Sequence, residues 1–454
     1  MRNCVSHDGK SNGHYGIHFS WVANGKIQNT TAYSNSYGIY LYISSNNQIT
    51  NCASHNNKEG VMLFTNSNNN QILNCTSYNN PGWGISLSGS SNNELVNCRS
   101  YNNDGGVSLL GSPYTKLRNN LIYNNRWEFD IRGDEPGDFC QDIDTSNTVN
   151  GKPICSLTGQ NNLTFDEAMS VGYLVLVDCH NISVEGLDIY GIAMANTSYS
   201  IISDVRSHNT SVGIYLHSSL NNRIINSECY NTSRGVHLDY TSNTTIANYR
   251  AYSNGGESIC LSYSSNITIT NSTLHNNAYG IRLVASPNNT ITNCALYNNY
   301  CGIYLRHSSN NNQITNCTIY NNSHGIQLAS ASNNQIANCF VYNSTRYDGI
   351  SLDSSSYNNL TNCVLYNNYC GIYLYLSSDN TIINCTSYNN SWAGIRFDYS
   401  STNAITNCLG YNNHLGIHLQ SSSNNTIINY AGHNNSGICM EYSSNTTITN
   451  CLCL

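Results

Sequence analysis

The sequence predicts an all-β fold, a right-handed parallel β-helix (a solenoid) of about 19 coils of 21–24 residues each. Three observations predict it. A Gly-Ile or Gly-Val pair recurs at this spacing, apolar and polar residues alternate only in short runs, and Asn, Ser and Thr fill the segments between the runs. The marker glycines are Gly16, Gly38, Gly60, Gly84, Gly106, Gly191, Gly213, Gly235, Gly280, Gly302, Gly325, Gly349, Gly371, Gly394, Gly416 and Gly437, with Ser258 in the same place between Gly235 and Gly280.

Each repeat unit is expected to hold short strands joined by tight turns. In residues 316–336, Ile326 and Leu328 alternate with polar neighbours, and Ile336 begins a second apolar alternation. Such patterns are typical of strands, whereas the Asn/Ser/Gly clusters favour turns that accept left-handed backbone. The unit is too short for a pair of helices, which needs about 33–47 residues. We therefore expect three short strands and three turns in each coil.

One slot of the repeat is held mostly by cysteine. Adjacent coils would place these Cα atoms about 4.8 Å apart, so free buried thiols and disulfides between adjacent coils both fit the pattern. This cysteine ladder comprises Cys4, Cys52, Cys75, Cys98, Cys294, Cys317, Cys339, Cys363, Cys385, Cys408 and Cys451. Cys301 and Cys370, in equivalent NNYCG turns, and Cys453 near the last ladder position are further candidates for cross-links between molecules.

Three residues after the cysteine slot, every aligned copy has Tyr or His. Rings one strand spacing apart stack and stiffen a solenoid, and amphipathic rings also form contact surfaces for sugars or for a second solenoid. Stacking alone or a contact surface would explain the pattern. The longest uninterrupted tyrosine run of this aromatic stripe is Tyr297, Tyr320, Tyr342, Tyr366, Tyr388 and Tyr411.

The repeat pattern divides the chain into three parts of one continuous solenoid. Coils are predicted over residues 1–125, an acidic loop and degenerate linking coils over 126–187, and a longer run of coils over 188–454. Carboxylates crowd the aperiodic part, and oxygen ligands suit Ca²⁺, although their spacing does not match an EF-hand loop. A calcium site and a solvated acidic loop are therefore both open. The proposed ligands are Asp130, Asp134, Asp138, Asp142 and Asp144, with Glu135 among them.

The repeat Ile-x-x-(Asn/Cys)-x-(Ile/Leu/Ser)-x-Asn-Asn-x-x-Gly-Ile-x-Leu-x-x-Ser resembles the parallel β-helix repeat family that includes NosD-like and carbohydrate-binding/sugar-hydrolase (CASH) proteins. The segment 146–187, with NTVNGKPI and GYLVLVDCHNISVEGL, is similar to links between β-helical blocks in surface-layer or sheath proteins of methanogenic archaea. The resemblance implies the fold. It leaves function open, because this fold carries lyases, hydrolases, epimerases, adhesins and envelope proteins.

An enzyme that hydrolyses or eliminates glycans would need carboxylates gathered on one strand face. Asp353 and Asp398 lie two coils apart on the face after the Gly-Ile marker, about 10 Å by strand spacing, slightly long for an inverting pair. Motifs of polygalacturonases and pectate lyases are absent from the sequence, as are a Walker loop, GxSxG and CxxC. The outward polar residues on this face are His217, His237, Asp239, Arg306, Asp353, Asp398, His418 and Glu441.

Other binding chemistry has weaker support. A net charge of −7 with 18 basic residues argues against nucleic acid. Copper binding of the NosD type would use His and Cys, but these residues follow the repeat and do not converge on a site. We expect no cofactor apart from the possible calcium.

Twenty cysteines and many Asn-x-Ser/Thr sequons suit an oxidising exterior, so we expect an extracellular or cell-surface location. No membrane span is expected. The chain starts and stops within the repeat register, which suggests head-to-tail and lateral homo-polymerisation. The function predicted first is thus a structural subunit of a sheath, surface layer or fibre. The alternatives are a glycan-binding adhesin and a polysaccharide-active enzyme, both with glycans as partners.

Overall fold

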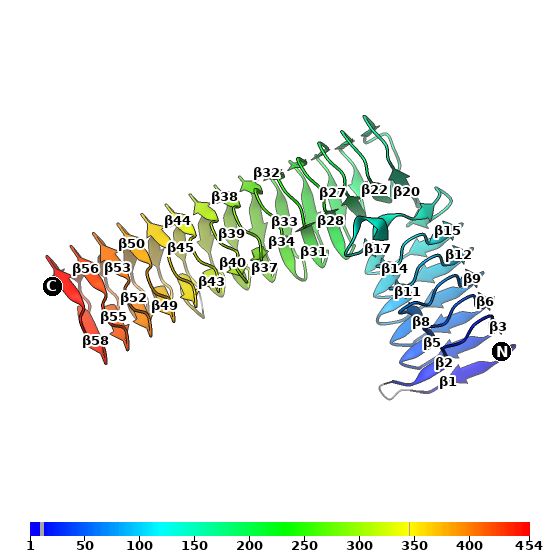
Figure 1. Ribbon diagram of the computed structural model, residues 1–454, viewed down its shortest axis with the longest axis horizontal. Helices are drawn as coiled ribbons and strands as arrows, with labels where there is room; N and C mark the ends of the chain where they lie inside the picture. The colour runs from blue at the N-terminus through cyan, green and yellow to red at the C-terminus, as the bar shows by residue number, and fades with distance from the viewer. Residues whose placement is uncertain (10–12, 345) are drawn as a thin grey trace. The chain divides into compact units, whose positions relative to one another are not determined.

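The computed structural model describes residues 1–9, 13–344 and 346–454, and their fold consists mainly of parallel β-strands (Figure 1). The prediction of an all-β parallel β-solenoid is confirmed. The described residues form one short helix, the 3₁₀ turn η1 (Pro136–Phe139), and no helix there is long and apolar enough to cross a membrane. The chain divides into two compact units: unit 1 is Met1–Asn222 with Tyr230–Ser233, and unit 2 is Arg223–Cys229 with Arg234–Leu454.

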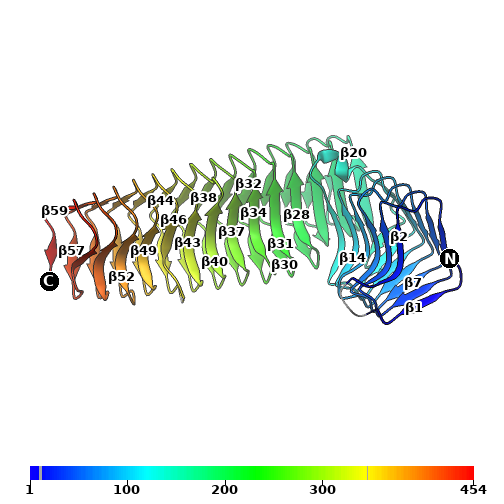
Figure 2. The same ribbon diagram turned by 60° about the horizontal axis from the view of Figure 1, so that its bottom comes forward.

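The first part of unit 1 stacks coils that each contain one long and two short strands (Figure 2). The long strands are β2 (Tyr15–Ser20), β5 (Tyr37–Tyr42), β8 (Glu59–Phe64), β11 (Trp83–Ser88), β14 (Gly105–Leu110) and β17 (Trp127–Arg132). One short ladder is β3 (Lys26–Gln28), β6 (Gln48–Thr50), β9 (Gln71–Leu73), β12 (Glu94–Val96), β15 (Lys116–Arg118) and β18 (Asp142–Ile143). The other is β1 (Val5–His7), β4 (Thr31–Tyr33), β7 (Ala53–His55), β10 (Thr76–Tyr78), β13 (Arg99–Tyr101), β16 (Leu121–Tyr123) and β19 (Thr148–Val149).

The segment expected to be aperiodic after residue 125 begins with a further coil. In parallel register with β14, β17 places Phe129 and Ile131 in the core, both 0% exposed. The sequence hid this coil because Glu128 stands where the Gly-Ile marker has glycine. Strands β18 and β19 complete the coil, and β19 then pairs antiparallel with β20 (Lys152–Thr158).

The second part of unit 1 resumes parallel stacking after β20. Its other long strands are β22 (Tyr173–Val177), β25 (Gly191–Ala195) and β28 (Val212–His217). Its short strands are β21 (Thr164–Phe165), β23 (Ser183–Glu185), β26 (Ile201–Ser203), β24 (Asp188–Ile189) and β27 (Arg206–His208).

Unit 2 repeats the same plan. Its long strands are β31 (Arg234–Asp239), β34 (Glu257–Ser262), β37 (Tyr279–Val284), β40 (Cys301–Arg306), β43 (His324–Ala329), β46 (Ile350–Asp353), β49 (Cys370–Tyr375), β52 (Ala393–Asp398), β55 (Leu415–Gln420) and β58 (Ile438–Glu441). One short ladder is β29 (Arg223–Ile225), β32 (Thr245–Ala247), β35 (Thr268–Thr270), β38 (Thr290–Thr292), β41 (Gln313–Thr315), β44 (Gln335–Ala337), β47 (Asn359–Thr361), β50 (Thr381–Ile383), β53 (Ala404–Thr406), β56 (Thr426–Ile428) and β59 (Thr447–Thr449). The other is β33 (Arg250–Tyr252), β36 (Thr273–His275), β39 (Ala295–Tyr297), β42 (Thr318–Tyr320), β45 (Phe340–Tyr342), β48 (Val364–Tyr366), β51 (Thr386–Tyr388), β54 (Leu409–Tyr411), β57 (Ala431–His433) and β60 (Leu452–Cys453); the residues of β30 (Glu228–Tyr230) fall in both units.

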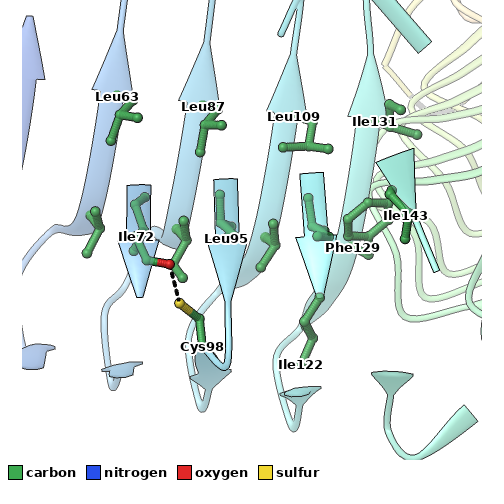
Figure 3. Packing of buried hydrophobic residues seen from close by; sticks show 14 of the residues in the cluster. Leu63, Ile72, Leu87, Leu95, Cys98, Leu109, Ile122, Phe129, Ile131 and Ile143 are labelled. Carbon is green, nitrogen blue, oxygen red and sulfur yellow. Dashed lines mark hydrogen bonds between the residues drawn. The ribbon is translucent and has the colours of Figure 1, made fainter. Parts of the chain in front are cut away.

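The core is a stack of aliphatic side chains that repeats with the coils. Figure 3 shows Leu63, Leu87 and Leu109 of successive long strands above Ile72 and Leu95 of the facing short strands. All five are 0% exposed. Since each coil packs mainly on the coils before and after it, the core grows with chain length instead of closing into a globule.

The Asn-Asn pair of the repeat has two separate structural roles. Its first residue adopts the left-handed conformation, as at Asn298 (φ 55°) and Asn321 (φ 54°), which asparagine tolerates better than most residues. Its second residue is buried and bonds the next coil: Asn299 N–H donates to Asn322 Oδ1 at 2.8 Å. These amide ladders satisfy turn backbone groups that water cannot reach.

Candidate active site

The outer face of the long-strand sheet in unit 2 aligns polar side chains of successive coils into two columns. Alternate strand residues point outward, and the parallel register repeats their position from coil to coil. The inner column is Ser351, Tyr373, Arg396, His418 and Cys439, and the outer column is Asp353, Tyr375, Asp398, Gln420 and Glu441.

The segment before β46 carries Asp348 and is longer than the equivalent segment before β43. Residues 321–326 read NNSHGI, whereas residues 343–350 read NSTRYDGI, so two residues are inserted and the second Asn is replaced by Ser344. The N–H of Cys370 in the following coil donates to Asp348 Oδ1 at 3.1 Å. The insertion therefore places a carboxylate beside the start of β49.

Tyr373, Arg396 and Asp398 form a hydrogen-bonded cluster next to this turn. Arg396 donates from Nε to Asp398 Oδ1 at 2.9 Å and from Nη2 to Oδ2 at 2.6 Å. The Tyr373 hydroxyl donates to Asp398 Oδ2 at 3.1 Å, and the guanidinium lies 5.2 Å from the tyrosine ring centroid. The bidentate pairing fixes Arg396 against Asp398, and the single hydrogen bond to Asp398 orients Tyr373.

Two adjoining hollows, of about 260 and 310 Å³, open over this cluster. Both are lined by Tyr347, Asp348 and Tyr373. The first also has His324, Gln327, Ser351, Leu352, Asp353 and Tyr375 in its wall, and the second has Arg346, Tyr369, Cys370 and Arg396. A concave surface with an apolar aromatic wall and a few convergent polar groups is the usual form of a small-ligand site.

The pKa values of Asp348 and Tyr373 give the hollows one proton acceptor and one proton donor. Burial raises the pKa of Asp348 to about 6, against the opposing effects of the Cys370 N–H and of Arg396, and Asp398 adds to the rise. Burial, assisted by the negative charge of Asp398, also raises the pKa of the Tyr373 hydroxyl, which therefore stays protonated at neutral pH. Near pH 7 the hollows thus contain an ionised carboxylate close to its pKa and a neutral phenol.

The structure brings some of the residues predicted from sequence to this site. Asp398 is 5% exposed and belongs to the cluster, whereas Asp353 is exposed, lines one hollow and bonds to Ser354. Tyr375 stands between the two aspartates in the register, so they do not face each other as a carboxylate pair. The paired-aspartate geometry of a hydrolase is not formed here.

The other predicted outward residues lie away from the hollows. His217 of unit 1 is 0% exposed, with its ring centroid 5.5 Å from that of Phe139. His237 and Asp239 belong to β31, and Arg306 belongs to β40. His418 and Glu441 lie one and two coils beyond Arg396.

Sequence reasoning missed three residues that define the site: Asp348, Tyr373 and Arg396. A 24-residue step between Gly325 and Gly349 signalled the enlarged turn, but the step between Gly60 and Gly84 is equally long. Tyr373 and Arg396 occupied ordinary variable positions of the repeat. Only the fold shows that the turn and both columns meet.

The acidic segment does not gather into an oxygen cage. Asp130 is 1% exposed and forms an ion pair with Arg132 at 2.7 Å, while Asp142 and Asp144 pair with Arg118 at 2.5 and 3.2 Å. Asp138 accepts the backbone N–H groups of Asp134 and Glu135 at 2.9 and 3.2 Å. The calcium site stays a prediction without support from this arrangement.

No member of the cysteine ladder forms a disulfide in the part of the chain that the structure describes. Ladder members such as Cys98 donate to backbone carbonyls, here to Ile72 O at 3.3 Å (Figure 3), which fits the free-thiol alternative. Cys301 and Cys370 are 0% and 1% exposed, so they are not accessible to a neighbouring molecule, contrary to the lateral cross-link predicted for them. Disulfides at Cys4, Cys451 and Cys453 stay predictions.

The aromatic stripe is a continuous stack along unit 2. Ring centroids of Tyr320 and Tyr342 lie 5.2 Å apart with planes at 7°, and those of Tyr388 and Tyr411 lie 4.6 Å apart at 6°. The stripe follows the ladder from β39 to β54, whereas the hollows open on the long-strand sheet. The stacking alternative is thus present in the structure, and a contact surface for sugars or for a second solenoid stays a prediction.

Comparison with known families places the chain among β-helical repeat proteins. The model described as periplasmic copper-binding protein (NosD) matches residues 176–348, 232–386 and 377–453, together more than half of the chain. The model described as right-handed beta helix region matches residues 2–168. The chain belongs to the NosD family of parallel β-helix proteins. The similarity to archaeal sheath proteins found in the sequence has no counterpart among these matches.

Several solved structures are similar to this chain, and no curated protein matches it. A mutant of the periplasmic alginate epimerase AlgG is 11% identical, with 64% of this chain and 78% of that chain covered and a TM-score of 0.47. The A-module of the mannuronan C-5 epimerase AlgE4 of Azotobacter vinelandii is 17% identical, with coverage of 74% and 91% and a TM-score of 0.47. A DFA-IIIase from Arthrobacter chlorophenolicus without its lid is 11% identical, with coverage of 52% and 66% and a TM-score of 0.40.

Proposed function

We propose that this protein binds an acidic polysaccharide along the outer face of the long-strand sheet in unit 2 and acts on it by general acid–base catalysis. One observation carries the proposal. Asp348, with a pKa raised to about 6, shares two hollows with the protonated hydroxyl of Tyr373. A carboxyl group with a perturbed pKa in a cleft is a candidate catalytic group on physical grounds.

The proposed chemistry is proton transfer at a sugar residue. An Asp348 carboxylate with a pKa near 6 combines sufficient basicity with a large ionised fraction at neutral pH, which suits a general base. Tyr373 supplies a phenolic proton on the same wall. Asp348 would take the proton next to the sugar carboxylate. Tyr373 would move its proton from the hydrogen bond with Asp398 to the leaving glycosidic oxygen in an elimination, or to the opposite face of the same carbon in a re-protonation. Asp348 then loses its proton to solvent and Tyr373 regains one from solvent before the next turnover.

The surroundings suit an extended and negatively charged chain. Tyr347, Tyr369, Tyr375 and Tyr399 are 43%, 45%, 37% and 55% exposed, and such rings offer flat, amphipathic surfaces for sugar rings. Arg346 lines the same hollow as Arg396 and offers a guanidinium to an acidic substituent. The coil spacing continues this surface along the sheet, so the site fits a polymer.

The test is a screen of polygalacturonate, alginate, hyaluronan and chondroitin sulfate with the full chain. Elimination is detected as unsaturated uronate by ultraviolet absorbance, and re-protonation as deuterium uptake at carbon by NMR in D₂O. We expect one of these activities on at least one polymer, and loss of that activity in Asp348→Asn by about 10²–10⁴-fold. Absence of both activities on every polymer would contradict the catalytic proposal.

The same screen separates catalysis from simple adhesion. Binding of each polymer is measured by calorimetry for the wild type and for Asp348→Asn. A substitution that removes turnover and keeps binding supports the enzyme. If the wild type binds a polymer tightly without changing it, the glycan-binding adhesin is the correct alternative.

A structural subunit of a cell-surface assembly is the second candidate. The stacked tyrosines and buried amide ladders favour a stiff scaffold, but the burial of Cys301 and Cys370 weakens the case for lateral disulfides. Electron microscopy with and without a thiol reductant tests this candidate directly. For either function we propose a location outside the cytoplasm, as the periplasmic description of the family suggests.

A further inference from the structure

His418, Cys439 and Glu441 bring three different metal-ligating groups together at the end of the two polar columns. Their ligand atoms all lie within 4.8 Å of one another, and this is the one such group of His, Cys, Asp and Glu among the residues that the structure describes. The three side chains come from two neighbouring strands, β55 and β58. His418 is aligned with Cys439, and Glu441 follows two residues later on the same face.

The imidazole of His418 is the informative member of this group. It is 4% exposed, and neither Nδ1 nor Nε2 has a hydrogen-bond partner. Its Nε2 lies 3.9 Å from Glu441 Oε2, too far for a hydrogen bond. A buried ring with two unpartnered nitrogens is unusual, because buried polar atoms are normally bonded. A metal ion at Nε2 would use one of these nitrogens.

We propose that His418, Cys439 and Glu441 bind a zinc-class divalent ion that ties β58 to β55. Imidazole nitrogen, thiolate sulfur and carboxylate oxygen are the three donor types that Zn²⁺ accepts in proteins. With bond lengths of about 2.0–2.3 Å, tetrahedral donors lie about 3.5 Å apart, so the side chains need to close by about 1 Å. Three protein donors leave the fourth position to water.

The donor set favours zinc over Cu⁺, although the family description names copper. Cu⁺ selects sites rich in thiolate and thioether, whereas this group offers one thiolate beside one imidazole and one carboxylate. The proposal is independent of the proposed function, since it requires neither Asp348 nor a polysaccharide.

Titration with Co²⁺ tests the site, because cobalt replaces zinc and reports a thiolate ligand through an intense near-ultraviolet charge-transfer band. The full chain is reduced, stripped with a chelator and titrated under anaerobic conditions. We expect the band to saturate at one equivalent of Co²⁺ and to disappear when Zn²⁺ is added. The Cys439→Ser variant should lack the band, and His418→Gln should bind more than about 100-fold more weakly, since even outer partners of metal sites contribute about 10–100-fold.

Cys453→Ser is the matched control, because Cys453 is an exposed thiol of the last strand, β60, outside the cluster. It should titrate like the wild type. The proposal is overturned if no band forms, if the band survives in Cys439→Ser, or if Cys453→Ser removes it. Tight binding of Cu⁺ with no binding of Zn²⁺ or Co²⁺ would overturn the zinc assignment. Circular dichroism of each variant shows that the coils remain folded.

Discussion

Of two consecutive turns in unit 2, the first keeps the regular Asn-Asn pair, and the second is longer and carries the proposed catalytic Asp348. In the turn at 321–325, Asn322 is 0% exposed, accepts from Asn299 N–H at 2.8 Å and donates to Leu296 O at 3.0 Å. In the turn at 343–349, Ser344 replaces that asparagine, yet its N–H still donates to Asn368 Oδ1 at 2.9 Å. The hydrogen bond to the next coil is retained, and the longer turn places Asp348 in the wall of the two hollows. A solenoid can therefore alter one turn without losing the stack.

The largest effect is expected at the altered turn. Asp348→Asn should lower turnover of the polysaccharide identified by the screen by about 10²–10⁴-fold, because the amide cannot accept the proton. Asp379→Asn, an exposed aspartate in a turn of the same unit, should leave turnover unchanged. Equal losses in both variants would show that general negative charge, and not Asp348, is required.

The regular turn should show the larger loss of stability. In Asn299→Ala, the N–H and side-chain amide of Asn277 lose their acceptor, which bonds them at 3.0 and 3.1 Å. We expect the free energy of unfolding to fall by about 1–3 kcal/mol, measured by urea denaturation. Asn298→Gly, at an exposed residue with φ 55°, should change it by only a few tenths, about 0.3 kcal/mol. If both variants lose the same stability, the amide ladder is not the source.

These contrasts also show what the sequence could predict. The 21–24-residue period, the Gly-Ile marker and the Asn-Asn pair each follow from coil geometry, so the fold, the cysteine ladder and the aromatic stripe were visible. The site depends on a non-periodic event, the insertion beside Asp348, and on the alignment of Tyr373 with Arg396 across coils. Burial of a carboxyl by the next coil leaves no local pattern. The coil at β17 was also hidden, since Glu128 stands where the marker has glycine.

The buried carboxylate of Asp348 is expected to lower the stability of the folded protein at neutral pH. Because the pKa of Asp348 is raised in the folded state from 3.8 to about 6, the folded state binds the proton more tightly. The stability from this group is present at low pH and is lost as the pH rises towards 6. Asp348→Asn should therefore raise the free energy of unfolding at pH 7 by about 1–2 kcal/mol, after allowance for the partial exposure of the carboxyl. At pH 4 the gain should be small. Urea denaturation at both pH values measures the difference. No difference between the two pH values would contradict the raised pKa.

Among the predicted contributions to stability, ring stacking in the aromatic stripe is expected to be the smallest. Tyr320 stacks on Tyr297 and Tyr342 at centroid distances of 4.9 and 5.2 Å. Tyr320→Ala should lower the free energy of unfolding by about 1 kcal/mol beyond the lost apolar area, whereas Tyr320→Phe keeps the stack and should change little. A comparable loss in Tyr320→Phe would mean that the hydroxyl, and not stacking, stabilises the stripe.

A measured pKa of Asp348 would test the proposed catalysis most directly. In protein labelled with carboxyl-¹³C aspartate, the Asp348 resonance is assigned by its absence in Asp348→Asn and followed by NMR as the pH is varied. We predict a midpoint near 6, the pKa that burial gives this carboxyl. A midpoint near the ordinary value of 3.8 would show a solvated carboxylate and remove the observation that carries the proposed catalysis.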